Sequence, residues 1–200
     1  FSAAMSALAG QDIKSLLSNL PADLEDLDLD VPGCAIPSDL QLAKLPLMPH
    51  KLRSARLAFN RCFHLSDAFL SALGQALPEE LEVLDISLAG CKLVTDEGIE
   101  ALACQLPAGL LFLKLDCACC LGLTDLAVQG LAKHLPQGIQ GLALDFACCQ
   151  KVTDRSVDCL RGSLPANLAS FSGCFSCTSV TGNDVVDLPQ IKARKLVTRV

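Results

Sequence analysis

The sequence contains no tryptophan and no tyrosine, and only 4% of its residues are aromatic. Because Trp and Tyr anchor many protein interfaces, any binding surface of this chain has to rely on other side chains. Basic residues are also in the minority, since 16 Lys and Arg against 22 Asp and Glu give a formal net charge of -6. A basic excess is what draws proteins to nucleic acid, so we expect no nucleic-acid partner.

Long hydrophobic runs are absent as well. The longest uncharged stretch, between Arg161 and Asp184, is interrupted by Gly162, Pro165 and many Ser and Thr residues. Hydrocarbon would leave their polar groups without partners, so we expect no membrane span. The first residues show no secretory signal and no transit peptide. Phe1 is not an initiator Met, which leaves open a processed terminus or a fragment end.

Regular repetition fills the chain instead. Its 200 residues are 51% hydrophobic and 19% charged, which is too apolar for a disordered chain. Leu-Pro pairs recur at steps of 29 residues, at Leu77-Pro78, Leu106-Pro107, Leu135-Pro136 and Leu164-Pro165. Met48-Pro49 and Leu20-Pro21 extend the series towards the N-terminus. A constant period of this size predicts an array of stacked units.

Within each unit the apolar spacing changes once. Leu84, Ile86 and Leu88 alternate with polar residues, which predicts a strand with one apolar face. Ile99 and Leu102 then fall on one face of a helix. Each unit is therefore expected to be one strand followed by one helix.

A Thr-Asp or Ser-Asp pair precedes each expected helix. The aspartates of these pairs are Asp67, Asp96, Asp125 and Asp154. Hydroxyl and carboxylate oxygens at a helix start are typical of N-caps. We therefore expect these residues to cap helices and not to form a row of acid–base groups.

The segments CKLVTD, CLGLTD and CQKVTD, and more loosely CFHLSD, resemble the leucine-rich repeat family, in particular its cysteine-containing subtype. The 29-residue period is similar to that of ribonuclease-inhibitor-like repeats. The resemblance implies an α/β fold, a leucine-rich repeat solenoid. We expect a short right-handed curved array of about six strand–helix units, with parallel strands on the concave face.

The organisation along the chain follows from the period. Residues 1–20 are expected to form an N-terminal helical incomplete repeat or cap, because Ile13 and Leu16 follow helical spacing. Repeats are expected over residues 21–188, and Pro189 opens a basic C-terminal tail over residues 189–200. The expected units cover about 21–48, 49–77, 78–106, 107–135, 136–164 and 165–188.

The 12 cysteines follow the repeat. Six of them recur at steps of 28 or 29 residues: Cys34, Cys62, Cys91, Cys120, Cys149 and Cys177. We expect a ladder of free thiols, packed as small apolar side chains at the turn after each strand. Free thiols are typical of an intracellular, reducing compartment, which we expect to be the cytoplasm, or an organelle reached by a targeting sequence since removed.

Further cysteines keep a second interpretation open. Cys117, Cys119, Cys148 and Cys174 lie close to the ladder in sequence, and thiolates on neighbouring units can bind zinc or an iron–sulfur cluster or form redox disulfides. Strand alternation sends Cys117 inward and Cys174 outward, so these two should not share an ion. We expect no metal and no cofactor.

The candidate binding residues lie on the solvent side of the predicted strands. They are Asp28, Asp30, Arg56, Asp85, Ser87, Lys114, Asp116 and Asp145. At the strand entrances Val83, Leu111 and Phe112 are either apolar anchors or packed on a neighbouring strand. The acid-rich segment 21–30 is either a solubilising end or a surface that steers a basic partner.

A concave repeat surface suits recognition of macromolecules more than chemistry. His50, His64 and His134 fall at different points of the repeat, so we expect no catalytic set and no enzyme. The leading hypothesis is a protein–protein interaction module: a scaffold, an adaptor or an accessory subunit of a larger assembly. The resemblance implies an alternative, the substrate-recruiting subunit of a ubiquitin ligase, although no F-box segment is present. The clustered cysteines imply another, a metal- or redox-responsive protein.

Overall fold

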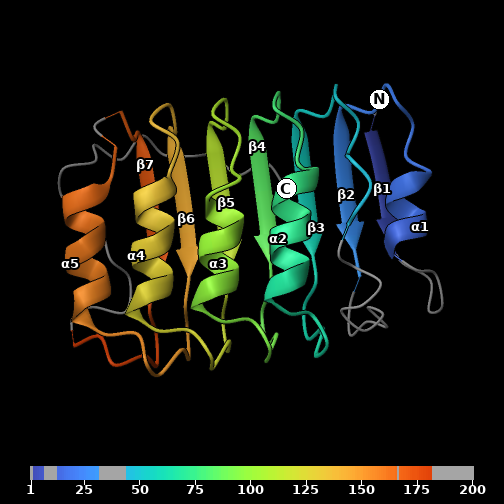
Figure 1. Cartoon of the computed structure of the whole chain (residues 1–200). Coiled ribbons are helices and arrows are strands. Elements are labelled where there is room, and N and C mark those ends of the chain that lie inside the picture. Colours follow the sequence, from blue (N-terminus) through green and yellow to red (C-terminus); the bar gives the residue numbers. More distant parts are fainter. Residues whose placement is uncertain (1, 7–12, 32–43, 166, 182–200) are drawn as a thin grey trace.

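The computed structural model describes residues 2–6, 13–31, 44–165 and 167–181, in which strands and helices alternate (Figure 1). The strands are β1 (Ser2–Ser6), β2 (Asp26–Asp30), β3 (Ser54–Ala58), β4 (Val83–Ser87), β5 (Phe112–Asp116), β6 (Gly141–Asp145) and β7 (Ser170–Cys174). The helices are α1 (Ile13–Ser18), α2 (Asp67–Ala76), α3 (Asp96–Ala103), α4 (Asp125–His134) and α5 (Asp154–Ser163).

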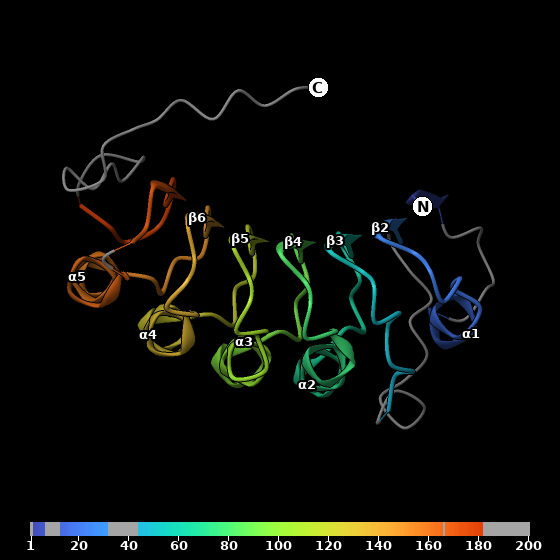
Figure 2. The ribbon, with the colours of Figure 1, turned by 90° about the horizontal axis from the view of Figure 1, so that it is seen from above.

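The strands form one seven-stranded parallel sheet whose order follows the chain from β1 to β7. Equivalent residues of successive units lie side by side, as Asp85 beside Lys114 and Lys114 beside Ala143. Strands make one layer and helices the other, and the array curves with its strands on the inner side (Figure 2). The predicted α/β solenoid with parallel strands on the concave face is therefore confirmed.

The core lies between the two layers. Leu84, Leu113 and Leu142 occupy one column of inward-facing strand positions and are at most 3% exposed. A single strand–helix unit has no second layer against which to bury such side chains, so each unit depends on its neighbours. Phe59 and Phe69 add an edge-to-face pair in the third unit, with ring centroids 5.2 Å apart.

The N-terminal unit differs from the expected helical cap. Its helix α1 is present and buries Ile13, Leu16 and Leu17, but residues 2–6 form the strand β1, which pairs in parallel with β2. Backbone hydrogen bonds to β2 can recruit a strand whose own sequence, SAAMS, carries little apolar alternation. The expected basic tail over residues 189–200 lies outside the described residues.

A ladder of thiols joins successive units behind the sheet, as the spacing predicted. Each sulfhydryl donates to a backbone carbonyl of the preceding unit: Cys91 Sγ to Phe59 O at 3.1 Å, Cys120 Sγ to Leu88 O at 3.1 Å, and Cys149 Sγ to Cys117 O at 3.2 Å. All three thiols are 0% exposed. The cysteine thus fills a narrow position and supplies a weak donor to a buried carbonyl.

One rung of this ladder is not a free thiol. Cys62 Sγ lies 3.2 Å from Val31 O, the equivalent position, but Cys62 is bonded in a disulfide. The expectation of a free thiol is therefore wrong at Cys62, because spacing along the chain reports where a sulfur lies and not its oxidation state. Cys34 lies outside the described residues.

Cys177 does not belong to the ladder. Its φ of 58° matches that of Cys119 at 60° and Cys148 at 62°, which immediately precede ladder cysteines. In the last unit the ladder position is held by Thr178, whose backbone N–H donates to Phe175 O at 3.3 Å. The expectation that placed Cys177 in the ladder is therefore wrong.

The prediction for Cys177 failed because the last unit is one residue shorter than the units immediately before it, and the missing residue falls after the ladder position. Asp125 bonds Thr153, 28 positions further along the chain, whereas Asp154 bonds Thr181, only 27 positions further. Because Thr178 still holds the ladder position, the missing residue falls between Thr178 and Thr181. The 28-residue step from Cys149 to Cys177 matches another step of the same length only by coincidence.

The aspartates of the Thr-Asp pairs do not cap their own helices. Each carboxylate instead accepts both the backbone N–H and the hydroxyl of the threonine in the next unit, as Asp96 does from Thr124 at 2.8 and 2.7 Å. Asp67, Asp125 and Asp154 repeat this with Thr95, Thr153 and Thr181.

Two of the threonines supply caps, whereas the side chains of Ser66 and Thr95 make no cap hydrogen bond. Thr124 Oγ1 accepts from Leu126 N at 3.2 Å, and Thr153 Oγ1 accepts from Arg155 N at 3.3 Å. The sequence predicted capping for both residues of the pair, but the carboxylates are drawn to the donors of the stacked neighbour. We call this row of contacts the Asp–Thr ladder.

Candidate functional site

The candidate site is the exposed side of the sheet. All eight predicted residues lie on strands β2 to β6 and on the side away from the helices, and each is half-buried or exposed. Strand alternation explains this, because the intervening residues, such as Leu84 and Ile86 on β4, are buried in the core. The parallel register then aligns the polar residues into two rows across the strands.

Charges in one row pair across neighbouring strands. Lys114 Nζ lies 3.1 Å from Asp85 Oδ2, and an Arg56 guanidinium nitrogen lies 3.8 Å from Asp28 Oδ2. All four side chains are a quarter or more exposed. Exposed pairs of this kind are each worth about 0–1 kcal/mol, so a partner can replace them at little cost.

The second row is engaged in local structure. Asp116 Oδ1 accepts from Ala118 N at 3.0 Å, and Asp145 Oδ1 accepts from Ala147 N at 2.8 Å. The Ser87 hydroxyl lies 2.7 Å from Asp116 Oδ2. These contacts hold the turn that follows each strand, so Asp116, Asp145 and Ser87 combine an exposed position with a structural role.

The three apolar side chains at the strand entrances behave differently, and Leu111 is half-buried. Val83 is 37% exposed. Phe112 instead lies over β6, where a Cβ added to Gly141 would come within 2.5 Å of Phe112 Cδ1. Of the two interpretations left open for these residues, packing on a neighbouring strand therefore describes Phe112.

One surface was missed by sequence reasoning. Phe63 is 50% exposed, Leu93 49% and Leu121 56%, and all three lie in the turns between strands and helices. Lys92 Nζ also sits 5.2 Å from the centroid of the Phe63 ring. The sequence signal was available, because the two positions after each ladder cysteine are apolar at these residues and elsewhere polar or glycine.

The buried thiols are chemically quiet. Burial raises the pKa of Cys91 and of Cys149 to about 11, and that of Cys120 to about 12. Burial also raises the pKa of Cys117 well above its usual range. Because the thiolate is the nucleophile and the metal-binding form, these thiols stay protonated and inert at neutral pH.

Of the four cysteines considered for metal binding, Cys117 and Cys174 lie on different sides of the sheet, whereas Cys119 and Cys148 occupy equivalent points of adjacent units. Cys117 is 0% exposed behind the sheet, whereas Cys119 is exposed at the turn. Cys174 lies on the strand face, 3.5 Å from the Ser176 hydroxyl. In the part of the chain that the structure describes, no group of three or more His, Cys, Asp and Glu side chains is arranged to hold a metal ion.

The histidines are separate from one another, as expected. His50 and His64 are exposed in turns, and His134 is the last residue of α4. No helix within the described ranges is long and apolar enough to cross a membrane.

An open parallel sheet in chain order, helices on its outer side and columns of buried leucine define a leucine-rich repeat solenoid. The resemblance inferred from the sequence motifs is thus confirmed at the level of the fold. No protein-family model matches the chain, and no curated protein matches its sequence.

Solved structures give the match. The chain is similar to the leucine-rich repeat-containing protein LegL7 from Legionella pneumophila, with a TM-score of 0.58 and 16% identity over 86% of this chain. It is also similar to a structure of the yeast complex of Rad7 and Elc1, with a TM-score of 0.51 and 19% identity over 99% of this chain. The chain spans 54% of the length of each, about half.

Proposed function

We propose that this protein is a non-catalytic protein-interaction module, an accessory subunit or adaptor that holds a partner protein on its concave strand face. The observation that carries the proposal is the alignment of eight polar and charged residues on one exposed side of a rigid sheet. Hydrogen bonds between adjacent strands fix the spacing of these side chains before any partner arrives, which lowers the entropy lost on binding.

The composition of this face indicates the kind of contact. Strand β2 presents Asp26, Asp28 and Asp30 to solvent, and Asp85 and Lys114 follow on the next strands. Without Trp or Tyr the face has no strong aromatic anchor, so binding is expected to use complementary charge over a broad area. The similar fold in the complex of Rad7 and Elc1 supports a role within an assembly.

The proposal is tested by reversing charge on one face at a time. In the concave variant, Arg56→Glu and Lys114→Glu convert two cations that each face an aspartate. The matched convex variant carries Lys133→Glu and Arg161→Glu, two cations that likewise each face an acid, Glu100 or Asp158. Partners captured from native extract by the unaltered chain are identified by mass spectrometry and then purified.

The concave variant is expected to bind the purified partner about tenfold more weakly, since the loss of two contacts worth about 0.7 kcal/mol each amounts to about 1.4 kcal/mol. The convex variant should bind as the unaltered chain does. Both should unfold at the same urea concentration, because exposed pairs contribute little to stability. Equal binding by the two variants, or loss only in the convex one, would refute the concave site.

We further propose an intracellular, reducing location. The free thiols of Cys104, Cys119 and Cys159 support it, while the disulfide at Cys62 argues the other way. Trapping thiols with an alkylating agent in intact cells, followed by peptide mass spectrometry, should find Cys119 and Cys159 reduced. Finding them oxidised in untreated cells would contradict the proposed location.

A further inference from the structure

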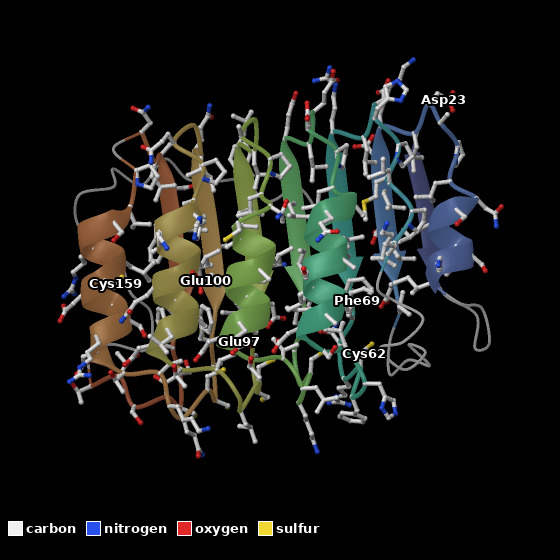
Figure 3. The ribbon with its side chains drawn as sticks, viewed as in Figure 1. Asp23, Cys62, Phe69, Glu97, Glu100 and Cys159 are labelled. Carbon is white, nitrogen blue, oxygen red and sulfur yellow. The ribbon has the colours of Figure 1, made fainter. Side chains whose placement is uncertain are left out.

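A cysteine and a histidine meet on the convex face, outside the site described above. Cys104 follows α3 directly and is exposed, and its Sγ lies 3.3 Å from His134 Nε2 at the end of α4. The two residues are 30 positions apart in sequence, one period plus one, so stacking of adjacent helices brings their ends together. Glu100, labelled in Figure 3, marks this region of the helix layer.

His134 is held among polar neighbours at the end of α4. Its Nε2 lies 3.8 Å from Glu100 Oε1, and its side chain is only 27% exposed. Lys133 Nζ lies 3.9 Å from the same carboxylate oxygen. Glu100 therefore faces both Lys133 and His134.

The ladder thiols, Cys159 and Cys174 lack this arrangement. The ladder thiols are buried, and burial raises their pKa. Cys159 on α5 is half-buried, with its Sγ 3.9 Å from the Ser163 hydroxyl, and Cys174 Sγ faces the Ser176 hydroxyl. A hydroxyl is too weak a base to take a thiol proton near neutral pH, whereas a neutral imidazole can.

We propose that Cys104 is a reactive thiol, activated by His134, and a site of reversible modification by low-molecular-weight disulfides. His134 Nε2 takes the proton from Cys104 Sγ as the sulfur attacks one sulfur of the disulfide. A new S–S bond forms to Cys104 and the original S–S bond breaks. The leaving thiolate then takes the proton from the imidazolium, so one thiol is oxidised and one is released.

The location makes such a modification compatible with the fold. Cys104 lies in the helix layer, and the strand face lies on the opposite side of the array (Figure 2). An adduct on an exposed sulfur at the end of α3 displaces no core side chain. The modification thus labels the convex face while the array stays folded.

The experiment exposes the full chain to oxidised glutathione at neutral pH and follows each cysteine by peptide mass spectrometry. Cys104 should form the mixed disulfide about tenfold faster than Cys119 and Cys159, which are the internal controls. In the variant His134→Gln, the rate at Cys104 should fall to that of the controls, while the rates at the controls stay unchanged. Added thiol reductant should restore the unmodified chain.

Two results would overturn the proposal. One is a rate at Cys104 no greater than at Cys119 or Cys159 in the unaltered chain. The other is a rate at Cys104 that His134→Gln leaves unchanged. Circular dichroism of the variant shows whether it is folded. Reaction at Cys91, Cys120 and Cys149 is a second check, because an unfolded chain would expose these thiols to the disulfide.

Discussion

At the scale of single residues, one backbone position in each unit from β3 to β7 is left-handed. Arg61, Cys119, Cys148 and Cys177 have φ between 58° and 62°, and Gly90 has φ of 76° at the equivalent point. A side chain at such a φ costs about 1 kcal/mol that glycine does not. Among these five units, only the one with Gly90 avoids this cost.

Introducing glycine at this position and removing glycine from it should therefore change the free energy of unfolding in opposite directions. Cys119→Gly should raise the free energy of unfolding by about 0.5–1 kcal/mol, because relief at φ of 60° exceeds the entropy that glycine adds to the unfolded chain. Gly90→Ala should lower it by about 1 kcal/mol. An added Cβ there would lie 3.4 Å from Arg61 Cγ, so the cost belongs mainly to the backbone. Urea unfolding measures both.

A buried thiol makes a different residue-scale test. Cys120→Ala removes the sulfur that donates to Leu88 O at 3.1 Å and leaves a small cavity, so unfolding should cost about 1–2 kcal/mol less. Cys159→Ala, at a half-buried sulfur that packs against the outside of the core and lies 3.9 Å from the Ser163 hydroxyl, is the control and should change stability less, by under about 1 kcal/mol. An equal loss in both variants would contradict a structural role for the thiol ladder.

At the scale of elements, the Asp–Thr ladder ties each helix start to the next. The pKa of the Asp125 carboxylate shows which protonation state the ladder contacts stabilise. Burial alone would raise its pKa, but hydrogen bonds from Ser156, from Thr153 N and from the Thr153 hydroxyl outweigh burial and hold the pKa below its usual 3.8. The Thr181 donors likewise lower the pKa of Asp154. The ionised form is the one that the fold binds.

Stability should follow the ionisation of Asp125. The pKa of Asp125 is lower in the folded chain than in the unfolded chain. Its contribution to stability is therefore complete at pH values above the unfolded-state pKa, and it is lost as the pH falls through the folded-state pKa. Asp125→Asn should therefore destabilise the chain at pH near 7 and have less effect as the pH falls below about 4. Urea unfolding at a series of pH values checks this. The exposed Asp158→Asn serves as control and should show no such convergence.

The elements also show how far sequence reasoning reached. The alternation of Leu84 and Ile86 and the helical spacing of Ile99 and Leu102 were sufficient to predict strand, helix and buried face, because burial dictates those periods. The partner of Asp96 was not predictable, since a Thr-Asp pair reads as a local cap until the neighbouring unit supplies better donors. Strand β1 was not predicted for a similar reason, because its formation depends on pairing with β2 and not on its own sequence pattern.

For the candidate site the same division holds. Strand alternation was sufficient to place Asp85 and Lys114 on the exposed side, but the short contact between them depends on the register of β4 and β5. The meeting of Cys104 and His134 was likewise hidden, because it requires the helix ends to stack with an offset of one residue.

At the scale of the whole molecule, the main contacts between the described strands and between the described helices α2 to α5 run from each unit to its neighbour. Successive strands pair, and α2, α3, α4 and α5 pack in that order (Figure 2). Stability in such an array is close to a sum of unit and interface terms, so damage at one end need not spread to the other.

Cavities at equivalent positions of two different units should therefore destabilise different parts of the array. Leu29→Ala, in β2, and Leu115→Ala, in β5, each empty a core position at most 2% exposed and should each destabilise by about 2–5 kcal/mol. Amide hydrogen exchange should show Leu29→Ala weakening protection near β2 and β3 but not in β6, and Leu115→Ala weakening it on both sides of β5. Uniform loss of protection in both variants would indicate one cooperative unit.

The two ladders also determine how an array of this kind can lengthen. Each cysteine bonds backward by one unit and each aspartate bonds forward by one unit. A duplicated copy of any interior segment of one full period would present the same donors and acceptors at both of its junctions. An insertion that moved these residues out of register with the neighbouring unit would leave a buried carbonyl and a carboxylate unmatched. Growth by whole periods is thus the change in length that this architecture tolerates best.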